Sequence, residues 1–270
     1  MVYLHRARKK SAAIAAAVLM AFMLVFPFNV VNAYEPRHPE VSDSADNSVS
    51  FIDEQTSSDL DAQSSTLQAV DISIFQKGVS AYQWALLKKQ GYDLGIVGSW
   101  HGVAWGANPY AEANLQSARS EDHKIATYLV LDSVMSGKEA VTKAKQACGS
   151  MWQHLSFVAI DLELEGITHQ QIQDATDAIR AEGKRPIIYT SKYWWDTFIT
   201  GDRFSDIPLW QARYDNNPRL SAVYRFGGWQ NSIGKQYKAD TILTGRQNKA
   251  LKDLTLDFNT FDSAFVNRVG

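Results

Sequence analysis

The chain has 270 residues, of which 45% are hydrophobic and 21% are charged, and its formal net charge is −2. This length allows one sizeable core, and the near-neutral charge gives no basic field that would favour nucleic acid as a partner. Cys148 is the only cysteine, so an intrachain disulfide is excluded; no Cys/His spacing typical of zinc is present, and we expect no metal and no cofactor.

The first 33 residues have the three-part pattern of a secretory signal peptide. Basic residues from His5 to Lys10 precede the apolar stretch 12–31, and the sequence Val-Asn-Ala ends at Ala33 as a cleavage site. An uncleaved anchor helix is the alternative, because the apolar stretch is close to the ~20 residues that span a bilayer. In either case we expect the rest of the chain to be extracellular, secreted or associated with the cell surface, and free of the membrane after cleavage.

Residues 34–68 are rich in Ser and Asp and have almost no apolar periodicity. Such a segment cannot bury enough apolar surface to offset its conformational entropy, so it predicts a disordered acidic linker. We expect the globular domain to occupy 69–270, with a monomer as the default state.

Apolar runs rich in β-branched and aromatic residues then predict eight strands. They lie at 70–75, 93–100, 124–132, 157–165, 186–191, 208–214, 227–233 and 254–261. Amphipathic stretches at 80–91, 110–121, 137–155 and 168–183 predict helices, and 192–199 predicts a short fifth one. Gly91 and Gly183 follow expected helix ends, and Thr168 is an expected N-cap.

Alternating strands and helices predict parallel βαβ units, and eight strands are enough to close a small barrel. We therefore predict an α/β fold: a TIM-like barrel of eight strands with about five helices, in which loops join the last three strands. An open doubly wound sheet is the alternative. It lacks support, because no junction between a strand and a helix has the sequence Gly-x-Gly-x-x-Gly.

Carboxylates gather near the ends of predicted strands, where barrel enzymes carry their chemistry. In FVAIDLELEG, Asp161 and Glu163 alternate with leucines and so face one side of a strand. Asp71 on the first strand and Asp257 on the last become neighbours if the barrel closes. Apart from Lys252 at an edge, these strands contain no basic residue. Crowded carboxylates raise one another's pKa, which favours acid/base catalysis.

Aromatic residues lie at or just after many predicted strand ends. Their flat apolar faces suit sugar rings, which indicates an extended polysaccharide with N-acetyl groups as substrate. The residues in this group are Trp100, Trp105, Tyr128, Tyr189, Trp194, Trp195, Trp210, Tyr214 and Trp229. Glu165 is expected to be a solvated loop residue.

From about Val70 to its end, the chain resembles the glycoside hydrolase family 25 muramidases, the lysozymes of the Chalaropsis and bacteriophage type. VDISIFQ is similar to that family's opening Asp-x-Ser-x-x-Gln strand, and FVAIDLELEG to its Asp-x-Glu strand. KRPIIYTS, PLWQARYD, GGWQ and LTLDFNTF are similar to the later strands in the family's order. The resemblance implies a barrel with five helices and three closing strands of antiparallel type.

The resemblance also implies an activity, the cleavage of peptidoglycan after N-acetylmuramic acid, with the glycan strand as the partner. Glu163 would be the general acid, Asp161 would orient the substrate or stabilise positive charge, and Asp71 and Asp257 would tune the pKa values of this pair. Tyr128, Tyr189, Trp210, Tyr214, Trp229, Gln230 and Trp100 would bind substrate. A spacing of ~7 Å for i and i+2 on a strand leaves retaining and inverting outcomes open.

Two segments depart from the family pattern. The second strand continues as GSWHGVAWGANP without the usual basic residue and Glu-Gly or Gln-Gly pair, and the third has TYLVLD without the usual His. These departures suggest a divergent subgroup. A chitinase-like glycosidase is one alternative, although its Asp-x-x-Asp-x-Asp-x-Glu pattern fails at two positions here. A non-catalytic wall-binding barrel is the other, and it would keep the aromatic residues but lose the acids.

Overall fold

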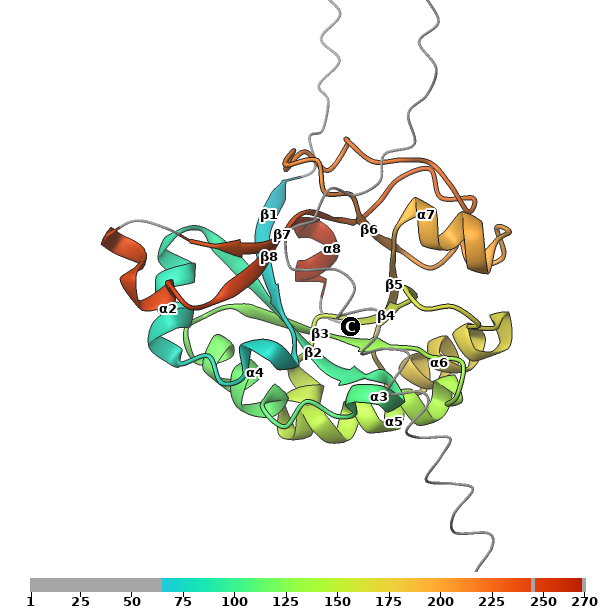
Figure 1. Ribbon diagram of the computed structural model, residues 1–270, viewed down its shortest axis with the longest axis horizontal. Coiled ribbons are helices and arrows are strands. Elements are labelled where there is room, and N and C mark those ends of the chain that lie inside the picture. Colours follow the sequence, from blue (N-terminus) through green and yellow to red (C-terminus); the bar gives the residue numbers. More distant parts are fainter. Residues whose placement is uncertain (1–64, 244–245, 269–270) are drawn as a thin grey trace, which may run out of the picture. The chain divides into compact units, whose positions relative to one another are not determined.

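The computed structural model describes residues 65–243 and 246–268, with side chains described throughout except at 246–248. The described part contains a closed barrel whose strands β1 to β8 follow one another around the ring in sequence order (Figure 1). The predicted signal peptide and residues 34–64 of the predicted linker lie outside the described residues. Within them, no helix has the length and apolar character needed to cross a bilayer.

The ring of strands confirms the predicted barrel in place of an open sheet. The strands are β1 Thr66–Ile72, β2 Tyr92–His101, β3 Lys124–Val130, β4 Val158–Asp161, β5 Pro186–Thr190, β6 Leu209–Ala212, β7 Gly234–Ile242 and β8 Thr255–Asp262. Neighbours from β1 to β7 are parallel, and β8 pairs antiparallel with both β7 and β1.

The expectation of three antiparallel closing strands is therefore wrong for β6 and β7. The long connection 213–233 returns the chain to the end of the barrel where β6 began, so β7 starts parallel to it. The predicted strand 227–233 is also wrong, because Gly227 and Gly228 adopt positive φ angles and turn the chain before β7 begins.

Two further boundaries differ from the predictions. β1 begins at Thr66, inside the segment assigned to the linker, and Leu67 is already buried in the barrel. β4 ends at Asp161, so Glu163 and Glu165 belong to the loop that follows it. The loop exposes Glu165, as expected from its position beside a glycine.

Four predicted helices are confirmed as α2 (Ala81–Lys89), α4 (Ala111–Ser120), α5 (Gly137–Cys148) and α6 (His169–Ala181). The predicted fifth is α7 (Lys192–Trp194), which continues as the π-helical turn η3 (Trp195–Ile199). Two further short helices are α3 (Gly102–Trp105) and α8 (Ser263–Asn267). The 3-10 turns are η1 (Ile74–Gln76), η2 (Gly149–His154) and η4 (Arg246–Leu251).

The helix ends follow the local sequence. Thr168 caps α6 by accepting a hydrogen bond from the backbone of Gln171, whose side chain in turn accepts from the backbone of Thr168. This reciprocal pair satisfies two amide groups that the first helical turn leaves free. Gly91 and Gly183 follow α2 and α6 with φ angles of 90° and 68°, a region that glycine enters without steric cost.

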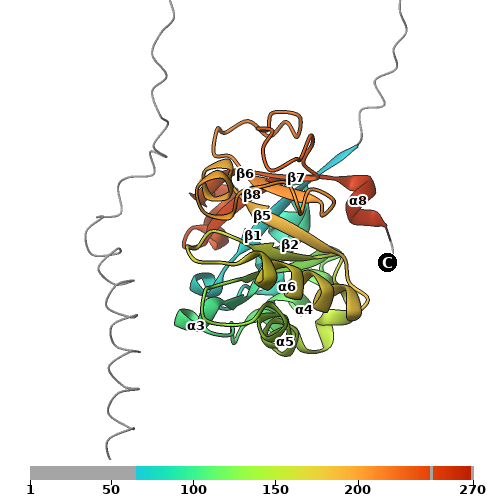
Figure 2. The same ribbon diagram turned by 90° about the vertical axis from the view of Figure 1, so that its right-hand side faces the viewer.

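Two apolar layers result from the alternation of side chains along the strands. Inside the ring, residues such as Ile96, Phe157 and Phe261 form an inner core. The opposite faces of the strands pack against the helices, and α4, α5 and α6 lie along one side of the barrel in both views (Figures 1 and 2). Phe265 and Val266 of α8 join the inner core and close the end where β1 begins. The other end, where β1 to β7 finish, is called the mouth below.

The closest helix contact lies where α5 begins. A Cβ atom placed on Gly137 would lie 2.0 Å from the carbonyl oxygen of Gln171 and 2.5 Å from the amide nitrogen of Ala175, both in the backbone of α6. Backbone atoms cannot move aside as a flexible side chain can, so only glycine allows this approach.

We therefore expect Gly137→Ala to destabilise the fold by about 1–3 kcal/mol, the usual cost of overpacking a well-packed contact. Thermal unfolding followed by circular dichroism measures the change. Gly78→Ala is the matched control, since nothing lies within 4 Å of its Cβ position. Equal melting temperatures for the two variants would contradict the account of this contact.

Candidate active site

Strand alternation brings carboxyl groups from distant parts of the chain to the mouth. On β1, Ala69 faces the inner core and Asp71 lies one inward position further toward the mouth. Asp71 is paired directly with Asp257 of the antiparallel strand β8. Asp161 is the last residue of β4, and Glu163 follows two residues later.

Asp71 and Asp257 share one amide donor. The Nε2 atom of Gln236 donates to Oδ2 of Asp71 at 2.8 Å and lies 3.5 Å from Oδ2 of Asp257. Asp71 also accepts from Nδ2 of Asn259 at 2.7 Å, and Oδ1 of Asp257 accepts from the backbone amide of Asp240 at 2.7 Å. These neutral donors satisfy oxygens that burial separates from water.

Asp161 and Glu163 have fewer hydrogen bonds. Oδ1 of Asp161 is buried and has no hydrogen-bond partner among the described residues. The backbone amide of Glu163 favours the ionised form of Asp161, but burial acts in the opposite direction and more strongly. A buried carboxyl oxygen without a donor favours the protonated form, because a bare charge there would be costly.

Burial is the main reason why the four carboxyl groups have raised pKa values. It raises the pKa of Asp161 to about 7, with Asp71 adding repulsion, and that of Asp257 to about 8, again with Asp71 adding repulsion. The pKa of Glu163 lies well above its usual 4.5 through burial and through repulsion from Asp161 and Asp71. No ion pair in the described part of the chain includes any of the four. They therefore form one interacting group that holds protons near neutral pH.

Phenol groups line the same side of the mouth. The hydroxyls of Tyr189 on β5 and Tyr214 after β6 both donate to Oε1 of Gln236, at 2.6 and 2.7 Å. With its oxygen accepting two phenols, the amide of Gln236 must present its nitrogen to Asp71. Burial raises the pKa of both phenols, and the nearby Glu163 carboxyl raises it further once it ionises, so the phenols remain donors at neutral pH.

Tyr128 on β3 is a third phenol in this group. Burial is the main cause of the raised pKa of its phenol, and all four carboxylates raise that pKa further. Tyr128 is therefore within electrostatic range of each of them. Its hydroxyl lies 3.3 Å from Nε2 of His101, and the same nitrogen accepts from the backbone amide of Ile74 at 3.3 Å. Burial lowers the pKa of His101 to about 4, so the imidazole is neutral and its proton lies on Nδ1.

Three tryptophans that the sequence predicted to bind substrate are buried, and Gln230, predicted to do the same, lies on an exposed loop. Trp210 is buried inside the barrel below Tyr189, with ring centroids 4.5 Å apart. Trp100 and Trp229 belong to the layer between barrel and helices, where they are 6% and 4% exposed. Gln230 is exposed in the loop before β7, and its amide bonds to the carbonyl of Gly228 in the same loop. The burial of the three tryptophan rings differs from the expectation that they are open to a substrate, and the role of Gln230 stays a prediction.

The structure adds two polar residues to the group. Gln236, not the predicted Gln230, is the glutamine that donates to Asp71. Asn259 donates from Nδ2 to Asp71 and accepts at Oδ1 from Nε1 of Trp210. Asn259 stands two residues after Asp257 in LTLDFNTF, so alternation could have identified it as inward-facing. Gln236 could not be identified in this way, because the strand was predicted to end at residue 233.

The described residues do not form a metal-binding site. The described residues contain no cluster of three or more His, Cys, Asp or Glu side chains arranged to hold an ion. What the group can do is donate a proton from one carboxyl while another stabilises positive charge, with phenols and amides binding polar groups of a ligand.

The family model for glycosyl hydrolases family 25 matches residues 70–245, well over half of the chain. This range includes Asp71, Asp161 and Glu163 and ends before β8. Asp257 lies outside the match, and its place in the group follows from the pairing of β8 with β1. A protein described as probable GH family 25 lysozyme 3 of Dictyostelium discoideum is 28% identical over 178 residues, which cover 62% of this chain and 37% of that relative. The chain thus spans little more than a third of that relative's length.

Solved structures of lysozymes share the fold. The bacterial lysozyme from Streptomyces coelicolor has a TM-score of 0.60 at 20% identity, covering 74% of this chain and 93% of that one. The family GH25 lysozyme from Aspergillus fumigatus has a TM-score of 0.58 at 20% identity, covering 74% and 95%. At such identities the comparison establishes the barrel architecture.

The raised pKa values predict how stability depends on pH. Burial raises the pKa of Asp161 from 3.8 to about 7, so the folded state binds this proton more tightly than the unfolded state does. The stability that this proton contributes is therefore fully present below pH 4 and is lost as the pH rises through about 7. Asp161→Asn keeps the neutral form, and we expect it to be more stable than wild type at pH 8 and nearly equal at pH 4.

Urea unfolding at the two pH values measures this difference. Asp253→Asn is the control, since its partner Lys252 is solvent-exposed and the Asp253 side chain is 87% exposed. A wild-type protein that is the more stable of the two at pH 8 would contradict the placement of Asp161 in an acidic, buried group.

Proposed function

The chain belongs to glycosyl hydrolase family 25, and we propose that it is a muramidase that hydrolyses the bond after N-acetylmuramic acid in peptidoglycan. The observation that carries this proposal is the group of four interacting carboxyls at the mouth, formed by Asp71, Asp161, Glu163 and Asp257. Glycoside hydrolysis requires one carboxylic acid and one carboxylate at the scissile bond, and this group supplies both near neutral pH.

Glu163 is the general acid in this proposal. Burial and two neighbouring aspartates keep it protonated, so it can donate its proton to the oxygen of the leaving sugar. It lies two residues after the end of β4, on the loop, where a carboxyl can project from the mouth toward a bound glycan chain.

Asp161 is the second carboxyl group at the bond. Its unpartnered Oδ1 is free to accept from the acetamido nitrogen of a sugar, or to face the positive charge that develops at the anomeric carbon. Proton loss from Glu163 increases the negative charge of the group as that positive charge appears. The transition state is therefore stabilised more than the ground state.

Asp71 and Asp257 act through the other two. Neither forms an ion pair with any described residue, and the donors that fix them are Gln236, Asn259 and the backbone of Asp240. Repulsion from Asp71 raises the pKa of both Asp161 and Glu163. Through Gln236, the same hydrogen bonds position the phenols of Tyr189 and Tyr214 beside the acids.

The site of action follows from the substrate and from the N-terminal sequence. Peptidoglycan lies outside the cytoplasm, and residues 1–33 have the pattern of a secretory signal. We propose that the chain is secreted and acts on cell walls as a monomer. Mass spectrometry of protein recovered from the medium tests this, with a mature N-terminus at Tyr34 as the expected result.

Glu163→Gln is expected to reduce the rate of wall clearing by at least about a hundredfold, because the amide cannot donate a proton to the leaving oxygen. The measurement is the loss of turbidity of bacterial walls together with the release of muramic acid reducing ends. Glu165→Gln, an exposed glutamate on the same loop, should keep wild-type activity. Full activity of Glu163→Gln would refute the assignment, and wall binding without any clearing by wild type would favour a binding module.

The pH profile of activity tests the interaction within the group. Activity should fall as the pH rises through the pKa of Glu163, because the acid must be protonated to act. Asp71→Asn removes a charge that raises this pKa, so the alkaline limb of kcat/KM should move to lower pH. Asp253→Asn should leave the limb unchanged. A limb that stays in place or moves upward in Asp71→Asn would show that the two groups do not interact.

A further inference from the structure

Two aromatic side chains are exposed together at the mouth. Phe75 is 57% exposed and Trp105 is 44% exposed, and their rings meet edge to face with centroids 5.0 Å apart. Phe75 lies on η1, directly after β1, and Trp105 on α3, directly after β2. Neither ring belongs to the two apolar cores, so packing does not account for them.

The backbone under both rings is held firmly. Ser73 and Gln76 form a reciprocal cap around η1, and Nε2 of Gln76 donates to the hydroxyl of Thr255 on β8 at 2.9 Å. On the other side, Oδ2 of Asp132 accepts from the amide of Val103 in α3 at 2.5 Å. A binding surface on such fixed turns loses little conformational entropy when a ligand binds.

Contacts connect the pair to the proposed active site. Ile74, the residue before Phe75, donates its amide proton to His101, and His101 contacts Tyr128. Tyr128 in turn lies within electrostatic range of all four carboxylates. The turn that carries Phe75 is thus linked through His101 to Tyr128, whose pKa is raised by burial and by the acids.

We propose that Phe75 and Trp105 form an outer sugar-binding site that holds a glycan strand beyond the two sugars at the scissile bond. The inference rests on the proposed function and extends it to the length of substrate. Exposed aromatic rings offer the apolar faces against which the C–H groups of a pyranose pack, and the turns after β1 and β2 place these two rings at the mouth, where a linear chain that leaves the acids can cross them. Val103 and Val134, also exposed, lie on segments that Asp132 anchors together and extend the apolar surface.

This site is a feature of this chain's own sequence. Trp105 belongs to GSWHGVAWGANP, the segment in which the second strand departs from the family pattern. A departure that adds an exposed tryptophan beside the mouth changes which substrates bind tightly, while leaving the acids in place. Longer glycan strands should therefore be favoured over short ones.

The test measures binding separately from catalysis. In the full chain carrying Glu163→Gln, the affinities for a peptidoglycan disaccharide and for an oligosaccharide of about eight sugars are determined by isothermal titration calorimetry. Adding Phe75→Ala or Trp105→Ala should weaken binding of the long oligosaccharide about tenfold, a typical loss for one aromatic contact surface. Binding of the disaccharide should change less than about twofold.

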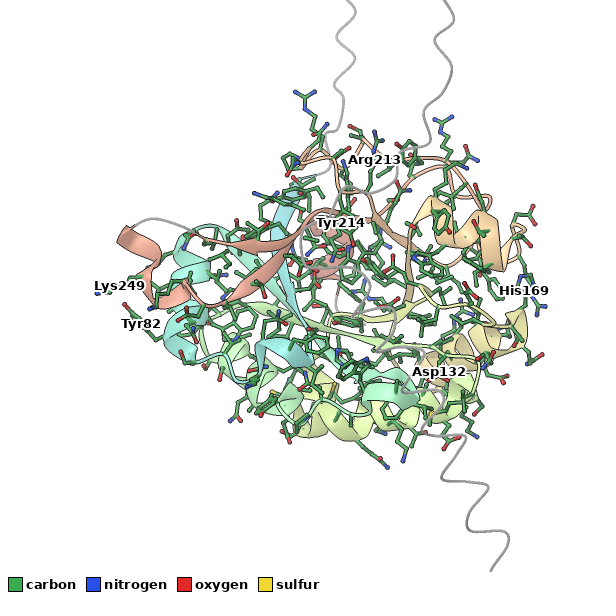
Figure 3. The ribbon with its side chains drawn as sticks, viewed as in Figure 1. Tyr82, Asp132, His169, Arg213, Tyr214 and Lys249 are labelled. Atoms are coloured by element: carbon green, nitrogen blue, oxygen red, sulfur yellow. The ribbon has the colours of Figure 1, made fainter. Side chains whose placement is uncertain are left out.

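Tyr82→Ala is the matched control. Tyr82 is 66% exposed, and Figure 3 shows it on α2, at the opposite side of the domain from Asp132. It should leave both affinities unchanged. Melting temperatures of the alanine variants should stay close to that of the parent, because exposed positions contribute little to stability.

Three results would overturn the site: unchanged affinity for the long oligosaccharide, equal losses for both ligands, or no binding of either ligand by the parent. The proposed function is tested independently by the hydrolytic activity of the wild-type chain. If that activity is missing while the long oligosaccharide still loses affinity in the two variants, the sugar-binding site stands and the muramidase assignment fails.

Discussion

The crowding of four carboxyl groups at the mouth, none of them in an ion pair with a described residue, is the constraint on which the rest of this structure depends. Asp71, Asp161, Glu163 and Asp257 cannot all be ionised there, because each charge would be poorly solvated and would repel the others. Protons and neutral donors must satisfy them instead. The amides of Gln236 and Asn259, and the phenols that donate to the Gln236 oxygen, serve this purpose, and the pKa of Glu163 lies well above its usual range.

The barrel provides the rigidity that such a group requires. Because β8 runs antiparallel to β1, it places Asp257 directly opposite Asp71 and then carries Asn259 inward, where it accepts from the indole of Trp210. Trp210 packs under Tyr189, so the floor of the site is part of the inner core. The four acids lower the stability of the fold at high pH, and the packed barrel below them offsets that cost. Stability and activity are thus opposed at these positions.

The sequence predicts the barrel, because its strands and helices follow from local periodicity. Alternation at 157–163 predicts that Asp161 and Glu163 lie on one face of a strand; β4 ends at Asp161, so Glu163 lies on the loop that follows, and the pKa values of the two groups show that they interact. β7 could not be predicted in this way, because its outer half is partly exposed and largely polar. The preceding GGWQNSI contains an aromatic and a β-branched residue, as strands often do, but its two glycines have positive φ. Because of the same error, Gln230 was predicted as the site glutamine, whereas Gln236 is the one that donates to Asp71. Trp100 and Trp229 were misplaced for another reason, since local sequence does not show which face of the barrel wall an aromatic residue occupies.

The central claim is that these carboxyls interact as one protonated group, and a carboxyl titration followed by ¹³C NMR tests it most directly. With glutamate side chains labelled at Cδ, the account predicts that the Glu163 resonance titrates well above pH 4.5 in the folded wild-type protein, and at lower pH when Asp161 is replaced by asparagine. A Glu163 resonance that titrates near pH 4.5 in both proteins would contradict the account, because it would show an acid that is solvated and unaffected by its neighbours.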